Sequence, residues 1–96
     1  MTSKDVTVIF SKAFRVVKVS INDKQWAVIT SGKKGVVRNV PEGDAYLSWF
    51  VVGNPGDKFD ITLENANKAT TGDSKISRTI PKGRVMNGKT ERINVK

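Results

Sequence analysis

The chain of 96 residues contains no cysteine and no histidine. Without cysteine, the protein has no disulfide bonds, no thiolate zinc ligands and no cysteine nucleophile. Without histidine, it also lacks the commonest general base and the commonest metal ligand of proteins near neutral pH. These absences exclude most familiar hydrolase mechanisms, and we expect a protein that is not an enzyme and that holds no metal and no cofactor.

Long apolar runs are also lacking. No segment approaches the roughly 18 consecutive apolar residues of a membrane span, and the apolar run that follows the first five residues is too short for a signal peptide. We therefore expect a soluble protein, either cytoplasmic or exported after removal of a signal that this sequence does not contain. With 96 residues and 38% hydrophobic residues, the chain builds one domain, residues 1–96, around a thin core.

Turn signals recur about every ten residues, which is typical of short strands joined by tight turns. The clearest are Asn54-Pro55-Gly56-Asp57 and Asn87-Gly88, followed by Pro41-Glu42-Gly43-Asp44 and Pro81-Lys82-Gly83. No amphipathic helical stretch separates them. The polar segment 65–75 is expected to be a loop, with one helical turn at about 64–69. Apolar residues alternate along residues 6–21, and further strands are expected at about 25–31, 35–40, 45–52, 58–64, 76–80, 84–86 and 90–95.

Alternation is clearest from residue 58 to residue 64, where Phe59, Ile61 and Leu63 share one face of a half-buried strand. Farther upstream, the adjacent Val16 and Val17 change the parity of the apolar residues and predict a bulge or bend there. The pattern as a whole predicts an all-β fold, a small antiparallel β-sandwich of the immunoglobulin-like or jelly-roll kind. The alternative is a five-stranded OB-like barrel, whose long bent first strand would cover residues 6–21.

Segment 45–52 is apolar on both faces of the expected strand, with Ser48 as its one polar residue. Such a strand is either covered on both faces or exposes one of them to a partner. In the second case, Tyr46 and Phe50 would form an exposed apolar patch, with Trp26 beside them. For a carbohydrate ligand, the exposed ring would be Trp49 or Trp26. Because a small sandwich needs only one buried face per strand, the second apolar face favours self-association or ligand contact.

The charge is strongly positive, with 17 Lys and Arg against 9 Asp and Glu, and it is segregated. Residues 1–40 and 68–96 each hold eight basic and two acidic residues, whereas residues 41–67 hold one basic and five acidic residues. Clustered cations favour an anionic partner, although lysine on a β protein also protects exposed strand edges. The candidate cationic residues are Lys33, Lys34, Arg38, Arg78, Lys82, Arg84, Lys89 and Arg92. A hairpin of 84–86 with 89–92 would bring Arg84, Lys89 and Arg92 to one end of a sheet.

Other chemistry finds little support in the sequence. Asp57, Asp60 and Glu64, or Glu42 with Asp44, could hold a hard cation, but no spaced Asp ladder is present, and we expect no metal site. There is no phosphate-binding glycine loop. The sequence thus predicts a non-enzymatic module that binds a protein partner or itself through the aromatic strand and a basic surface. The alternatives are a nucleic-acid-binding OB-like protein, another module for an anionic polymer such as an acidic glycan, and a lectin-like carbohydrate-binding domain.

Overall fold

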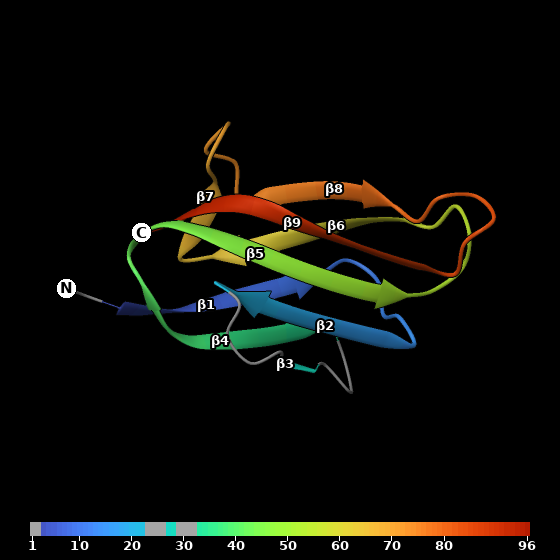
Figure 1. Ribbon diagram of the computed structural model, residues 1–96, viewed down its shortest axis with the longest axis horizontal. Coiled ribbons are helices and arrows are strands. Elements are labelled where there is room, and N and C mark those ends of the chain that lie inside the picture. Colours follow the sequence, from blue (N-terminus) through green and yellow to red (C-terminus); the bar gives the residue numbers. More distant parts are fainter. Residues whose placement is uncertain (1–2, 23–26, 29–32) are drawn as a thin grey trace.

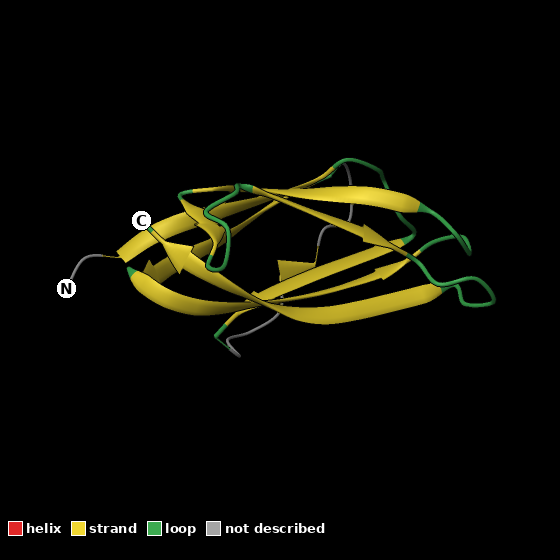
Figure 2. Ribbon diagram, turned by 90° about the horizontal axis from the view of Figure 1, so that it is seen from above, coloured by secondary structure: helices red, strands yellow, loops and turns green. Residues whose placement is uncertain are grey.

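Two antiparallel β-sheets lie face to face and make up the molecule (Figures 1 and 2). The computed structural model describes residues 3–22, 27–28 and 33–96. The described part contains nine strands and no helix, and it measures 43 × 27 × 19 Å along its principal axes. The predicted all-β sandwich is therefore confirmed, and the expected helical turn at about 64–69 is wrong, because the chain forms a strand at 66–68 there.

The strands follow the apolar alternation of the sequence. Their bounds are β1 Ser3–Phe10, β2 Val16–Ile21, β3 Ala27–Val28, β4 Lys34–Pro41, β5 Gly43–Val52, β6 Lys58–Glu64, β7 Ala66–Lys68, β8 Lys75–Thr79 and β9 Met86–Val95. Strand β6 matches the predicted alternating segment 58–64. Of the predicted strand 25–31, only Ala27 and Val28 lie within the described residues.

The strand order shows why the molecule is a sandwich and not a barrel. One sheet has the order β4-β1-β6-β8 and the other the order β3-β2-β5-β9-β7. The chain changes sheet at nearly every connection, and β2 and β3 are the one consecutive pair of described strands that share a sheet. The OB-like alternative is wrong, because β1 and β2 are separate strands in different sheets rather than one long bent strand.

The change of sheet between β1 and β2 also explains the parity change near residue 16. The chain leaves β1 after Phe10 and enters β2 at Val16, and residues 11–15 form the corner between the two sheets. No bulge is needed at Val16-Val17, since Val16 is the first residue of β2 and Val17 points into the core. The predicted change of chain direction is confirmed, but it occurs at residues 11–15 rather than at Val16-Val17.

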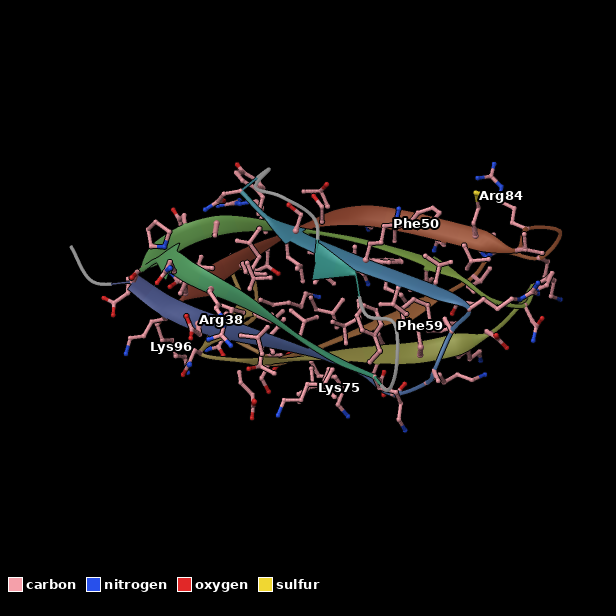
Figure 3. All side chains as sticks on the ribbon, turned by 90° about the horizontal axis from the view of Figure 1, so that it is seen from below. Arg38, Phe50, Phe59, Lys75, Arg84 and Lys96 are labelled. Atoms are coloured by element: carbon pink, nitrogen blue, oxygen red, sulfur yellow. The ribbon has the colours of Figure 1, made fainter. Side chains whose placement is uncertain are left out.

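The core lies between the sheets and is built from the inward residues of both. Four aromatic rings meet at its centre: Phe59 contacts Phe10, Phe14 and Trp49 with centroid separations of 6.2, 5.1 and 5.4 Å. Figure 3 shows Phe59 between the two layers. Because interior packing is dense, this cluster fixes how the sheets sit on each other.

Two predicted Pro-Gly turns form where expected. Gly56 has φ 82°, and the Asp57 N–H donates to the Asn54 carbonyl over 3.1 Å, as in a type II turn. Gly83 has φ 83°, and the Arg84 N–H donates to the Pro81 carbonyl over 3.2 Å.

The predicted turn at Asn87-Gly88 is wrong, because both residues lie inside β9 and pair with β5. Gly88 does not have the positive φ that a type I′ turn requires. The Asn87 side chain instead donates to the Thr79 carbonyl of β8 over 3.1 Å and so links the two sheets. The reversal of the chain is made earlier, at Pro81–Arg84.

Gly53 marks a tight corner after β5. A Cβ atom at this position would lie 2.6 Å from Cδ1 of Phe14 and 3.0 Å from Cδ1 of Ile80. We expect Gly53→Ala to lower the free energy of unfolding by about 1–3 kcal/mol through overpacking. Urea denaturation of the wild type, Gly53→Ala, Phe14→Leu and the double variant measures this. The cost of Gly53→Ala should be smaller in the Phe14→Leu background than in the wild-type background, and equal costs in both backgrounds would contradict the steric explanation.

Candidate binding face

Strand β5 carries the aromatic segment and lies at the centre of the five-stranded sheet, between β2 and β9 (Figure 1). Its inward residues Ala45, Leu47, Trp49 and Val51 are buried in the core. Its outward residues are open to a different extent: Tyr46 is 55% exposed, and Phe50 and Val52 are half-buried. Of the two alternatives predicted for this doubly apolar strand, the structure supports the one in which one face is partly open.

The strands beside β5 place a cation next to each outward aromatic ring. Arg92 of β9 is the register partner of Tyr46, and Lys18 of β2 is the register partner of Phe50. Both cations are exposed, and neither has an ion-pair partner among the described residues. Side chains directly opposite each other in an antiparallel pair have Cβ atoms about 5 Å apart. Each ring therefore has a positive charge within reach of any ligand that contacts it.

Gly88 occupies the other side of Phe50. A Cβ atom at position 88 would lie 3.3 Å from Cδ1 of Phe50 and 3.1 Å from the Trp49 carbonyl oxygen. The Phe50 ring thus leans over β9 at a position where any larger residue would displace it. Figure 3 shows Phe50 on the layer of the five-stranded sheet.

We call this surface the aromatic face and define it by the outward residues of three strands. It consists of Val16, Lys18, Tyr46, Ser48, Phe50, Val52, Met86, Gly88, Thr90 and Arg92. Ser20 also has outward parity but is buried. None of these described positions is Asp or Glu, and the first carboxylate along β5 is Asp44, in the row beyond Tyr46. The aromatic face is therefore apolar and cationic.

One end of the aromatic face is mainly aliphatic. Val16, Val52 and Met86 form a cross-strand row, and the Gly53 N–H donates to the Val85 carbonyl over 2.7 Å. Met86 is 50% and Val85 45% exposed. Arg84 projects from the same end, on the side away from the other sheet (Figure 3).

Two tryptophans were candidates for ligand contact. Trp49 is only 1% exposed, and its indole Nε1–H donates to Oε2 of Glu91 over 3.1 Å. The proposed ligand contact of Trp49 is therefore wrong, because the indole fills the core. Trp26 lies outside the described residues.

Arg78 is likewise not available to an anionic ligand. Its guanidinium donates from Nε to Oε2 of Glu91 over 2.7 Å and from NH2 to Oε1 over 2.6 Å. The two residues come from different sheets, β8 and β9, so the paired hydrogen bonds join the sheets at that side of the sandwich. The prediction that Arg78 binds a partner is wrong, since its charge is already neutralised inside the protein.

The carboxylate of Glu91 is the charged centre of this contact. Burial alone would raise its pKa, but hydrogen bonds from Arg78 and Trp49 and the positive charges of Arg78 and Lys89 outweigh burial and lower the pKa from its ordinary value of 4.5. The folded protein therefore favours the ionised form of Glu91 more than the unfolded chain does.

The remaining predicted cations are spread over the molecule. Arg38 donates to Oδ2 of Asp5 over 3.2 Å in an exposed ion pair, and Figure 3 shows it toward the opposite end from Arg84. Lys33 and Lys34 are exposed at the start of β4, in the other sheet. Lys82 lies in the turn before Arg84. Of the predicted cations among the described residues, Arg92 lies beside an aromatic ring of β5, and Arg84 lies at the aliphatic end of the aromatic face.

Lys89 does not lie beside Arg92 at the end of a hairpin, as the sequence predicted. The predicted hairpin of 84–86 with 89–92 does not form, because Met86–Val95 is one strand. Lys89 is the register partner of Trp49 and has inward parity at the open side of the sandwich, whereas Arg92 has outward parity. The two cations therefore belong to different faces.

Sequence reasoning missed Lys18 and Glu91. For Lys18, the alternation of residues 17–21 already placed its side chain on the polar side of a strand, but only the pairing of β2 with β5 brings it to Phe50. No sequence signal marks Glu91 as buried.

A polar pocket of about 340 Å³ lies on the four-stranded sheet and is lined by Ser11, Asp60, Ser77 and their neighbours. The Ser77 hydroxyl donates to Oδ1 of Asp60 over 2.6 Å. Asp60 is the one carboxylate among the residues that line this pocket, so the pair that glycosidase chemistry needs is not present there. The described residues contain no group of three or more acidic residues placed to hold a metal ion. They also contain no helix long and apolar enough to cross a membrane.

Removing Arg78 would leave the Glu91 carboxylate buried without its cation. We expect Arg78→Met to lower the free energy of unfolding by about 3 kcal/mol, at the lower end for a broken buried pair because the Arg78 side chain is 24% exposed. The matched control is Arg38→Met, which breaks the exposed pair with Asp5 and should cost less than about 1 kcal/mol. Equal losses for the two variants in urea denaturation would contradict the structural role of Arg78.

The lowered pKa of Glu91 also predicts a pH dependence. As the pH falls below about 4.5, the unfolded chain binds a proton at Glu91 before the folded protein does, so acid favours unfolding. The stabilisation is fully present above that pH and is lost as the pH falls through the lower folded-state pKa. Urea midpoints between pH 3 and pH 7 should therefore fall less steeply for Glu91→Gln than for the wild type. Parallel curves would contradict this prediction.

Comparison with protein families, with curated proteins and with solved structures finds no match for this chain. No relative therefore suggests a ligand. The aromatic face combines partly open rings with two cations that have no ion-pair partner among the described residues, and the functional proposal rests on this surface.

Proposed function

We propose that the protein is a non-enzymatic binding module that engages an anionic macromolecule through the aromatic face. The observation that carries the proposal is the register of β5 with its neighbours, which sets Lys18 beside Phe50 and Arg92 beside Tyr46 on a face whose described positions include no carboxylate. Apolar groups of a partner would be buried on the rings and on the aliphatic end, and its negative charges would lie at the cations.

The charge of the face argues against a second copy of this chain as the partner. In a symmetric dimer, the same patch meets itself, so Lys18 and Arg92 would face the identical cations of the other copy. The whole chain has a formal charge of +8, which adds a long-range repulsion between copies. An anionic partner removes both penalties, and we therefore favour it over self-association.

The charge also argues against a neutral carbohydrate. An exposed ring would suit a sugar, and Ser48 and Thr90 carry hydroxyl groups on the same face. However, the two hydroxyl oxygens lie 3.0 Å apart and bond to each other. Lys18 and Arg92 would gain little from a neutral ligand, whereas an anionic polymer uses rings and cations together.

The test compares two pairs of charge removals that lower the net charge equally. Lys18→Gln with Arg92→Gln alters the aromatic face, and Lys58→Gln with Lys75→Gln alters the outward side of the four-stranded sheet. Lys75 lies on the far side of the molecule from Phe50 (Figure 3). All four side chains are exposed, so folding should be preserved.

We expect the first pair to weaken binding to polyanions by about tenfold or more and the second pair by much less. The measurement is fluorescence anisotropy at about 0.15 M salt with labelled heparin, polyglutamate and single-stranded DNA. If no polyanion binds, or if both pairs weaken binding equally, the proposal fails. A dimer whose mass does not depend on salt, detected by sedimentation of the same samples, would favour self-association instead.

A further inference from the structure

The spacing of rings and cations on the aromatic face points to a particular class of anionic partner. We infer that the face binds single-stranded nucleic acid, with bases stacked on Phe50 and Tyr46 and phosphates held by Lys18 and Arg92. This inference rests on the proposed function and goes beyond it by naming the partner.

The first argument is the arrangement along β5. Tyr46 and Phe50 lie four residues apart on one face of the strand, which separates them by about 13 Å. Each ring has its cation in the same cross-strand row, with Arg92 in β9 and Lys18 in β2. A single strand that crosses both rows would meet a ring and a positive charge twice, which matches the repeat of base and phosphate in a nucleic acid.

The second argument is the low surface between the two rings. The row between them carries Ser48 and Thr90, whose small side chains bond to each other. On the β9 side of Phe50 stands Gly88, which has no side chain. Nothing on these described positions rises between the rings, so a flexible strand can pass from one to the other. Open sheets with exposed rings bind single-stranded RNA by stacking in this way.

The aromatic face belongs to a sheet and carries no protruding helix or ribbon among its described strands, which disfavours duplex DNA. An element that reads the major groove is a protruding helix or a two-stranded ribbon. The aromatic face lies on three adjacent strands within a sheet, β2, β5 and β9, and its bases would have to be unpaired to reach the rings (Figures 1 and 2). Paired bases are already stacked inside a duplex, so only the cations would act on it.

The experiment compares a ten-nucleotide oligothymidine with an abasic oligonucleotide of the same length and with a duplex. Binding is measured by fluorescence anisotropy at several salt concentrations. If bases stack on the rings, oligothymidine should bind the full-length wild type at least tenfold more tightly than the abasic strand does. The Tyr46→Ser and Phe50→Ser variants should each lose about tenfold in affinity for oligothymidine and little for the abasic strand.

Three control variants distinguish the contribution of base stacking to binding from that of charge and from a loss of folding. Val36→Ser removes an exposed apolar side chain from the other sheet and should leave binding unchanged. Lys18→Gln with Arg92→Gln should lower the slope of log affinity against log salt by about 1.4, since each phosphate contact on a single strand contributes about 0.7. If Phe50→Ser fails to fold, Phe50→Leu keeps the packing over Gly88 and still removes the ring.

The outcomes for the two proposals are distinct. If the abasic strand or the duplex binds as tightly as oligothymidine while Lys18→Gln with Arg92→Gln still weakens binding, the inference about nucleic acid is overturned and the proposed function stands. The same holds if only heparin or polyglutamate binds through the face. If no polyanion binds, both proposals fail.

Discussion

The contact of Glu91 with Trp49 and Arg78 is the interaction on which the arrangement of the molecule depends. Its carboxylate accepts hydrogen bonds from the indole of its own sheet and from a guanidinium of the other sheet. Because an ionised group cannot be moved to another environment without losing these bonds, Glu91 fixes the inward parity of β9. A shift of one residue would turn Glu91 outward and Arg92 inward. The contact therefore also decides that Arg92 stands beside Tyr46 and that Gly88 lies beside Phe50.

The inward face of β5 contributes to stability, and the outward face is the one to which we assign the proposed recognition. Its inward residues join the core, where Trp49 packs on Phe59 with a centroid separation of 5.4 Å. Its outward residue Tyr46 and the neighbouring Met86 of β9 stay exposed, because no third layer of described residues covers this side of the sheet. The cations from β2 and β9 help to keep this surface solvated. An apolar surface with positive charges suits a partner that carries rings or apolar groups together with negative charge.

Predictions that depend on neighbouring residues in the sequence were correct where no contact between distant segments intervenes, and predictions were wrong where such a contact decides the structure. Strand β6 and the Pro-Gly turns were predicted correctly, since strict alternation and a glycine with positive φ are local properties. The sequence left open whether Tyr46 is buried or exposed, because both faces of residues 45–52 are apolar, and only the structure shows it exposed. Asn87-Gly88 was mistaken for a turn, because its local preference is overridden by pairing along the whole of β5. Arg78 was mistaken for a surface cation, since Glu91 lies 13 residues away in sequence and in the opposite sheet.

The all-β class, the positive charge, the absence of cysteine and histidine chemistry, and the two-sided apolar character of residues 45–52 can all be read from the chain before it folds. These properties depend on composition and on the period-two pattern, which the chain carries before it folds. Only the tertiary structure decided which cations stand beside which rings. Strand order and register bring together Lys18, Phe50 and Gly88 from three distant segments. This order and register are set by packing in the core and by the buried carboxylate of Glu91 rather than by any local preference of the backbone.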